Sequence, residues 1–423
     1  VYAVLQENGL GVSDVTPFAQ MSEAAGGMLT GDSILFVDGF DRALKIPDKG
    51  YPGMSLQKTE SEKAIRGSNE GFGDAIKQNT ALIRKRLRSV DLKVAECKCG
   101  KRTATNVDIM YLDGIVRPEI VTQMQQRLAA FEIDGIGDSG VIEQLTETQW
   151  FSPFPQYQTT RRPDRAVMAL LEGRSVLLAD NSPEALIFPT DYNSFIKTTD
   201  DYYTRWEIAT FTRTLRYVAA FLSMILPGLY LAMTNFHTQL LPTKLLLSFA
   251  AARQGVPFPG VVEVLLMELS FELLREAGVR LPGAMGNTIG IVGGLIIGQA
   301  AVDANIVSPM VVIVVAFTAL CSFAIPNEDF ATAFRLLKFV FIGLSAALGF
   351  YGFLIGLLIL LIHLAQLESF GMPYLMPFVG ADLNDYRDER DSLVRPPLQA
   401  LTHRPFYANP KNRVRLRMKY KNR

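Results

Sequence analysis

The chain has 423 residues, of which 49% are hydrophobic, and its 42 basic side chains balance 42 acidic ones. This length allows two or three domains. The lack of a basic patch interleaved with aromatic residues argues against nucleic-acid binding. Nearly all of the charge lies before Arg216 or after Leu367, which indicates a soluble first half followed by a membrane part. The chain begins with Val1 without a signal peptide, which leaves open that an N-terminal part is missing.

The first 58 residues have the pattern of a partial α/β subdomain. The stretches VYAVLQ and SILFVDGF have the composition of strands, and a helical stretch between them ends at Gly26-Gly27. The polar, turn-rich segment DKGYPGMSLQKTESE follows and is typical of a linker. We therefore predict a partial N-terminal subdomain over residues 1–58.

Helices and strands alternate over residues 59–210. LKVAEC and TATNVDIMYLDGI are predicted strands, and the next predicted helix carries Pro118 in its first turn. The helix RPDRAVMALLEG is closed by Gly173, and RSVLLAD and EALIFP then predict a hairpin around residues 181–183. The alternation predicts a second cytoplasmic subdomain of the α/β or α+β class.

The sequence GDSG at residues 137–140 matches the serine segment of trypsin-like proteases. That chemistry requires a histidine base and an aspartate that orients it. The chain has three histidines, and two of them lie in or beside apolar segments. We interpret the segment as a turn that opens a helix, with Asp138 or Ser139 as its N-cap.

Cofactor and metal signatures are weak. Cys97 and Cys99 lack a second cysteine pair or a nearby histidine, so they make a poor zinc signature. A phosphate-binding G-x-x-x-x-G-K-[ST] motif is absent from the sequence. We expect no catalytic residues, no cofactor and no metal, and we do not expect an enzyme.

Residues 211–380 predict a helical, polytopic membrane domain. Residues 217–236 are long enough and apolar enough to span a bilayer. Arg213 and Arg216 precede this span and favour a cytoplasmic location for its first end. Pro227 and Gly228 are hinge candidates because proline interrupts the hydrogen bonding of a helix near mid-membrane.

Two further predicted spans, 286–305 and 308–325, form a tight hairpin. The first carries glycines at intervals of four, which form a ridge where another helix can approach closely. The sequence leaves open whether that helix belongs to the same chain. The predicted packing residues are Gly286, Gly290, Gly294 and Gly298.

The fourth predicted span, 336–367, is longer than one crossing requires. We favour one long tilted helix over a break near Gly349 to Gly352. The tail, 381–423, carries eleven Lys or Arg residues and is expected on the cytoplasmic side. With both ends inside the cell, four spans satisfy the topology and place residues 237–285 on the outer side.

A charged amphipathic helix is predicted over residues 260–277. At 100° per residue, four charged side chains lie on one arc and leucines lie opposite, while Glu263 in the first turn is an exception that suits the helix dipole. Two interpretations remain open: a helix at the membrane interface with its acidic face in water, or a helix that lines a pore or vestibule and attracts cations. The pore or vestibule candidates are Glu263, Glu268, Glu272, Arg275 and Glu276.

Several stretches resemble the GerA family, the A-subunits of bacterial spore germination receptors. They are the run from VPFPGVVEVLL to VVAFTAL, with SPFPQYQTTRRPD, LLEGRSVLLAD, DDYYTRW, FHTQLLPTKLL and ESFGMPYLMPF. The resemblance covers about residues 60–400 and extends to a paralogue encoded in the stage V sporulation A operon. Arg161 and Ser68 depart from the family pattern, which has Glu and Pro at these positions.

The resemblance implies a subunit of an oligomeric, nutrient-gated ion channel in the inner membrane of the spore. It also implies a transporter-like B-subunit, a lipoprotein C-subunit and membrane lipid as partners. A non-conducting scaffold and a germination-amplifying paralogue are the alternatives.

Overall fold

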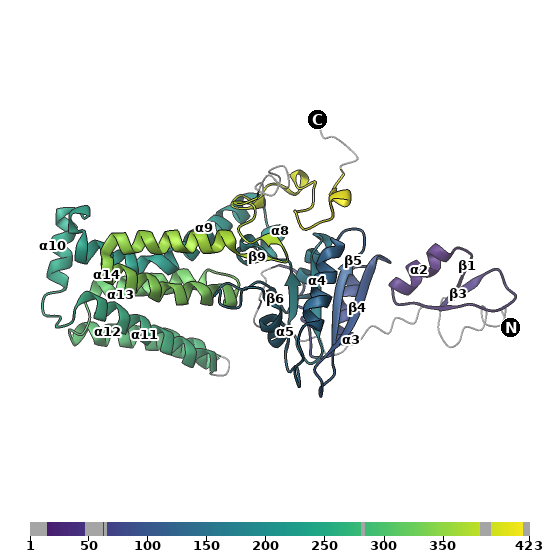
Figure 1. Ribbon diagram of the computed structural model, residues 1–423, viewed down its shortest axis with the longest axis horizontal. Helices are drawn as coiled ribbons and strands as arrows, with labels where there is room; N and C mark the ends of the chain where they lie inside the picture. Colours follow the sequence, from purple (N-terminus) through teal and green to yellow (C-terminus); the bar gives the residue numbers. More distant parts are fainter. Residues whose placement is uncertain (1–14, 47–61, 63–65, 281–283, 381–390, 418–423) are drawn as a thin grey trace.

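The structure is a computed structural model that describes residues 15–46, 62, 66–280, 284–380 and 391–417. A bundle of long helices lies at one end, a mixed domain of sheet and helices lies beside it, and a small sheet lies at the other end (Figure 1). The fold therefore combines helix and sheet, as the sequence predicts.

The small sheet has three antiparallel strands in the order β1-β3-β2, with one helix beside them. Its elements are β1 (Thr16–Phe18), α2 (Met21–Leu29), β2 (Ser33–Leu35) and β3 (Ala43–Ile46). The strand expected in SILFVDGF is confirmed at β2, and α2 continues two residues past the glycine pair. The strand expected in VYAVLQ and nearly all of the expected linker lie outside the described residues.

The central domain is built on a five-stranded antiparallel sheet with the order β4-β5-β7-β8-β6. The predicted helix with Pro118 at its start, the helix closed by Gly173, and the hairpin that follows are all confirmed. The elements are α3 (Ile76–Arg86), β4 (Leu92–Cys99), β5 (Thr105–Leu112), α4 (Pro118–Ala129), α5 (Ser139–Thr146), β6 (Gln158–Thr160), α6 (Pro163–Leu171), β7 (Ser175–Ala179) and β8 (Ala185–Phe188).

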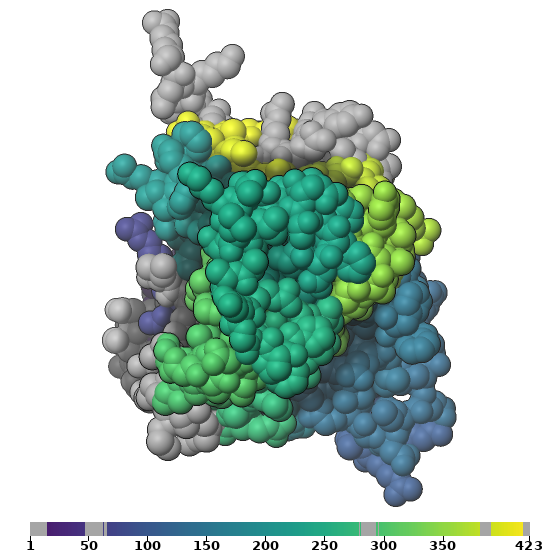
Figure 2. Space-filling view, turned by 90° about the vertical axis from the view of Figure 1, so that its left-hand side faces the viewer, coloured from purple at the N-terminus to yellow at the C-terminus, as the bar shows by residue number. Residues whose placement is uncertain are grey.

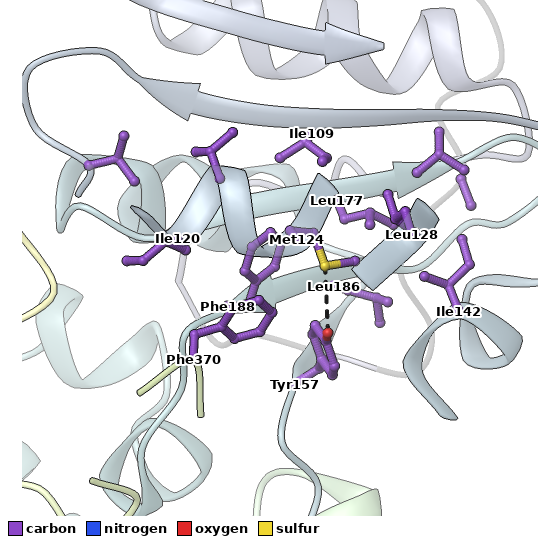
Figure 3. Packing of buried hydrophobic residues seen from close by; sticks show 14 of the residues in the cluster. Ile109, Ile120, Met124, Leu128, Ile142, Tyr157, Leu177, Leu186, Phe188 and Phe370 are labelled. Carbon is purple, nitrogen blue, oxygen red and sulfur yellow. Dashed lines mark hydrogen bonds between the residues drawn. The ribbon is translucent and has the colours of Figure 1, made fainter. Parts of the chain in front are cut away.

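This sheet is buried on both faces. Successive side chains of a strand point to opposite faces, so Ile109 joins a cluster with α4 and α5, while Met110 joins a cluster with α3 and α6. Figure 3 shows the first cluster, where the Tyr157 hydroxyl lies 3.6 Å from the sulfur of Met124. Burial on both faces explains why β7 and β8 are continuous apolar runs.

The bundle follows the sheet domain in the chain. Two of its described helical segments, Trp206–Phe236 and Glu328–Gln366, are long and apolar enough to cross a membrane. Its helices are α9 (Trp206–Leu231) with a π-helical end (Ala232–Phe236), α10 (Thr243–Ala252), α11 (Gly260–Arg280), α12 (Ala284–Asp303), α13 (Pro309–Phe323) and α14 (Glu328–Gln366), and the short helices α7 (Tyr192–Ile196) and α8 (Asp200–Tyr203) precede them. Figure 2 shows the end of the bundle away from the sheet domain, where α10 and the chain after it cover much of the surface.

The expectation of one uninterrupted fourth helix is wrong. Gly349 has φ 60° and ψ −138°, which lie outside helical values, and a Cβ placed on Gly352 would lie 2.1 Å from the carbonyl oxygen of Leu344. The chain therefore folds back on itself. Phe154 of the sheet domain contacts both Phe330 and His363, which lie near opposite ends of α14. The two halves of α14 form a helical hairpin whose open end faces the sheet domain (Figure 1).

Helix α11 lies within the bundle. Near its start, Glu263 accepts a hydrogen bond from the backbone N–H of Ser308, the residue before α13. Near its end, Arg275 donates to Ser322 in the last turn of α13. The sequence interpretation placed this segment beyond the first span on the outer side, but the structure lays it along α13.

The described part of the tail packs on the sheet domain. The amide of Asn409 donates to the carbonyl of Ile115 at 2.7 Å, and the guanidinium of Arg404 donates to the carbonyl of Leu171 at 2.9 Å. A Cβ on Gly173 would lie 2.6 Å from Cα of Ala408, so the two backbones are in close contact. The tail therefore forms part of the wall of this domain.

Candidate functional site

The centre of the candidate site is a buried lysine in the bundle. Nζ of Lys338 lies 2.5 Å from Oε2 of Glu268 and 3.3 Å from Oε1 of Glu272. Lys338 and Glu268 are only 4% and 2% exposed. The i,i+4 spacing on α11 places both carboxylates on the side that faces α14, so one lysine can pair with both.

A second layer of charges continues from this lysine towards the sheet domain. Arg335 lies 3.4 Å from Oε2 of Glu272 and 3.2 Å from Oε1 of Glu328. Arg275 lies 3.7 Å from the same oxygen of Glu328, and its guanidinium lies 4.7 Å from the centre of the Phe323 ring. We call these six residues the bundle network: Glu268, Glu272, Arg275, Glu328, Arg335 and Lys338.

The bundle network is electrically balanced, with three carboxylates and three cations. A buried ion would be costly without such a partner, and removal of one partner leaves an uncompensated charge. Two buried polar atoms of the network have no hydrogen-bond partner among the described residues: Oε1 of Glu268 and Nε of Arg335. The network can therefore accept and donate further hydrogen bonds without losing its ion pairs.

The other two acidic candidates have separate surroundings. Glu263 is fully buried, pairs with Arg253 at 3.2 Å, and accepts from the amide of Ser308 at the start of α13. Glu276 is exposed and pairs with Arg280 at 2.6 Å. The five candidates therefore do not form one acidic surface. Glu263 and Glu268 are buried, whereas an interfacial helix would expose its acidic face to water.

The predicted glycine ridge lies on α12. A Cβ on Gly294 would lie 3.8 Å from Phe271 of α11, and one on Gly298 would lie 3.4 Å from Val312 of α13. Gly286 and Gly290 occupy the first turns of the same helix. For the two glycines whose surroundings are described, the neighbouring helices belong to the same chain.

The hinge candidates lie inside α9, which continues as a helix through Pro227. A Cβ on Gly228 would lie 2.9 Å from the carbonyl oxygen of Phe341 and 3.0 Å from Oγ of Ser345. The absence of a side chain at Gly228 thus lets the backbones of α9 and α14 approach each other. The expected departure from helical geometry falls slightly later, in the π-helical turn from Ala232 to Phe236.

A second buried ion cluster ties α9 to the rest of the chain. Arg213 is fully buried, donates to Asp391 at 2.7 Å, and lies 3.3 Å from Asp201 of α8. Burial alone would raise the pKa of Asp391, but Lys197 and Arg213 hold this pKa below its ordinary value. We call Asp201, Arg213 and Asp391 the Arg213 clamp, because it joins α8, α9 and the tail.

Lys338, Arg335 and Arg213 are not among the functional residues that the sequence predicts. Lys338 and Arg335 lie at the edge of a long apolar run, and a cation at that position requires a buried partner. That signal was available in the sequence. Arg213 was interpreted only as a flanking charge, because the sequence does not reveal that α9 begins at Trp206.

The GDSG segment has a structural role, as predicted. The carboxylate of Asp138 accepts a hydrogen bond from the amide of Gly140 at 3.0 Å and caps α5. The Ser182 hydroxyl donates to the hydroxyl oxygen of Ser139 at 3.0 Å, and no described histidine contacts this serine. Among the residues that the structure describes, no three His, Cys, Asp or Glu side chains gather as a metal site.

The fold and the bundle network are those of a protein with a sheet domain and a charged helical bundle. A sheet domain precedes a helical bundle in which two apolar segments, α9 with its π-helical end and the α14 hairpin, are long enough to cross a membrane, and the bundle contains paired charges. The sequence pattern of the Bacillus/Clostridium GerA spore germination protein family matches residues 2–407 of the chain. The chain belongs to this family.

Known proteins resemble the chain over most of its length. Spore germination protein KA of Bacillus subtilis is 42% identical over 388 residues, which cover 92% of this chain and 71% of that protein. The uncharacterized membrane protein YfkQ of Bacillus subtilis is 40% identical over 403 residues, which cover 94% of this chain and 77% of that protein. Spore germination protein GerLA of Bacillus cereus is 38% identical over 412 residues, which cover 97% of this chain and 83% of that protein.

The N-terminal domain of the A subunit of the Bacillus megaterium spore germinant receptor GerK3 also matches. This domain is 31% identical to the chain. The match covers 44% of this chain and 67% of the solved chain, with a TM-score of 0.34.

Proposed function

We propose that the protein is the A-subunit of a spore germination receptor and that its bundle contributes to an oligomeric, nutrient-gated ion channel. The observation that carries the proposal is the bundle network. Lys338 and Glu268 are buried and paired in a bundle whose other faces are largely apolar. Ionisable residues inside membrane helices commonly mark ion pathways or the elements that gate them.

The bundle geometry supports a polytopic membrane domain. Helix α11 follows α13 from Ser308 to Ser322, and the α14 hairpin leaves the sheet domain and returns to it. In this proposal α9, α11, α12, α13 and both halves of α14 cross the bilayer, which gives six crossings rather than four. Both the sheet domain and the tail then lie on the cytoplasmic side of the spore inner membrane.

The proposed assembly includes further copies of this chain, a transporter-like B-subunit, a lipoprotein C-subunit and membrane lipid. The names of several relatives, such as spore germination proteins A1 and B1 of Bacillus subtilis, are consistent with a multi-subunit system. We propose no catalytic activity; among the described residues, the hydroxyl of Ser139 contacts Ser182 rather than a histidine base.

A second candidate function is a non-conducting scaffold, in a receptor or in a germination-amplifying paralogue. The specific observation in its favour is that Glu263 and Glu268 already pair with Arg253 and Lys338. Carboxylates that are neutralised inside one chain offer little charge to a passing cation. In this alternative the bundle network only fixes the packing of α11 on α14.

The test is cation efflux from germinating spores that carry Glu268→Gln with Glu272→Gln. We expect slower efflux after nutrient addition for each receptor molecule, and the amount of protein in the spore membrane is measured alongside because Lys338 loses both partners in this variant. Glu276→Gln is the matched control, since Glu276 is exposed and lies outside the bundle network. Normal efflux from the double variant, together with no ion current from the purified receptor in liposomes, favours the scaffold.

A further inference from the structure

A cavity of about 370 Å³ lies where the tail docks on the sheet domain. Residues of α6 and α7 form part of its wall, and tail residues 400–407 with Arg415 form another part. The volume lies within the range of roughly 300–1,000 Å³ that is usual for small-molecule sites. This cavity is separate from the bundle network.

Arg174 supplies a buried donor to this cavity. The side chain is 4% exposed, its Nε donates to the carbonyl of Pro189 at 2.7 Å, and its Nη1 donates to Oε1 of Gln158 at 3.0 Å. These two bonds fix the plane of the guanidinium. Nη2 has no hydrogen-bond partner among the described residues. A buried N–H without an acceptor is unfavourable, and the guanidinium-bearing side chain of Arg174 lines the cavity.

The charges around the cavity favour an anion inside it. Positive side chains outnumber carboxylates by two among the charged residues that line the cavity. Arg415 lies 4.0 Å from Glu172, so that pairing is loose, whereas Lys197 lies 3.4 Å from Asp391. The charged lining residues are Arg165, Arg174, Lys197, Arg404 and Arg415, with Glu172, Asp191 and Asp391.

We propose that this cavity binds a small organic anion whose carboxylate or phosphate group lies against the guanidinium of Arg174. Guanidinium groups bind both kinds of oxyanion through charge-assisted hydrogen bonds. Met168, Ala169 and Phe406 also line the cavity and supply an apolar surface for the body of such a molecule. The cavity volume exceeds that of a bare inorganic ion, which favours an organic ligand.

The tail closes one side of this site. Tyr407 lies with its ring centre 5.3 Å from the guanidinium carbon of Arg174, and Gly173 contacts Ala408. A ligand held between Arg174 and the tail therefore stabilises the docked tail, since a ligand that binds one arrangement shifts the equilibrium towards it.

The experiment measures ligand binding to the full chain, purified in detergent, by isothermal titration calorimetry. Malate and acetate are the carboxylate ligands, and glycerol 3-phosphate and inorganic phosphate are the phosphate ligands. We expect saturable binding of at least one organic anion with one site per chain. We also expect slower hydrogen exchange of residues 400–408 in the presence of that ligand.

Three variants locate the site. Arg174→Gln removes the donor, and Met168→Trp fills the cavity without removing a polar group, so each is expected to weaken binding at least tenfold. Arg88→Gln, at an exposed arginine remote from the cavity lining, is expected to bind as the unmodified chain does. If Arg174→Gln fails to fold, Met168→Trp decides the question. Absence of saturable binding, or unchanged binding by Met168→Trp, overturns the proposal.

Discussion

Lys338 and Glu268 form the most deeply buried ion pair that links α11 to α14, with 2.5 Å between Nζ and Oε2. Glu272 lies 3.3 Å from the same Nζ, so one ammonium group faces two carboxylates. We expect Lys338→Met to leave Glu268 buried and unpaired, which costs about 3–5 kcal/mol of stability. Thermal unfolding of the purified protein in detergent measures this loss.

The double variant Lys338→Met with Glu268→Gln separates charge from packing. It removes one charge of each sign, so we expect it to recover most of the stability that the single variant loses. Equal instability of the single and double variants would show that the stem of Lys338, rather than its charge, is required.

Gly228 allows α9 to contact α14. A Cβ at this position would lie 2.9 Å from the carbonyl oxygen of Phe341, so Gly228→Ala forces the helices apart. We expect a loss of about 1–3 kcal/mol, as for other overpacked sites. Gly343→Ala is the matched control on α14, since a Cβ there meets no atom within 4 Å. The control is expected to keep or slightly raise the unfolding temperature, and equal effects of the two changes would contradict this account.

Gly173 holds the tail on the sheet domain. It has φ +91°, and a Cβ would lie 2.6 Å from Cα of Ala408, so Gly173→Ala adds backbone strain and displaces the tail. Gly255→Ala is the control, because Gly255 also has positive φ but open space around it. We expect faster hydrogen exchange over residues 400–408 only in the Gly173 variant. If hydrogen exchange over residues 400–408 were equally fast in both variants, backbone strain alone would explain the effect.

Glu143 gives the sheet domain a pH dependence. Burial, with the nearby carboxylates of Glu147 and Asp329, raises the pKa of Glu143 to about 8 from an ordinary value of 4.5. The folded protein therefore holds this proton more tightly than the unfolded chain does. The associated stability is fully present below about pH 4.5 and is lost as the pH rises through about 8.

Glu143→Gln carries no titrating proton, so its unfolding free energy is expected to change less over this pH range. Denaturant titrations at several pH values measure the difference. Glu119→Gln, at an exposed position of α4, is expected to keep the pH profile of the unmodified chain. An unchanged slope in the Glu143 variant would show that other groups cause the dependence.

Local sequence patterns predicted much of the sheet domain. Pro118 marked the start of α4, Gly173 marked the end of α6, and continuous apolar runs marked the β7–β8 hairpin. Each of these features depends on residues close together in the chain. The cap formed by Asp138 was predictable for the same reason, because it bonds to an amide two residues away.

The bundle was harder to predict because its decisive contacts join residues far apart in the chain. The periodicity of α11 identified the charged side of Glu268 and Glu272 but not what that side faces. Lys338 lies 70 residues after Glu268, and no local pattern pairs them. The break at Gly349 was considered, but an apolar run does not distinguish one long helix from a hairpin. A tertiary contact, that of Phe154 with both ends of α14, distinguishes the two.

The Arg213 clamp has a mechanical consequence. Arg213 holds the beginning of α9 to Asp201 on one side and to Asp391 on the other, so a rotation of α9 relative to α8 and the tail breaks these ion pairs. Fifteen residues further along, Gly228 brings the backbone of α9 against that of Phe341. The helix that the Arg213 clamp holds at its beginning therefore contacts the backbone of α14 three residues from Lys338.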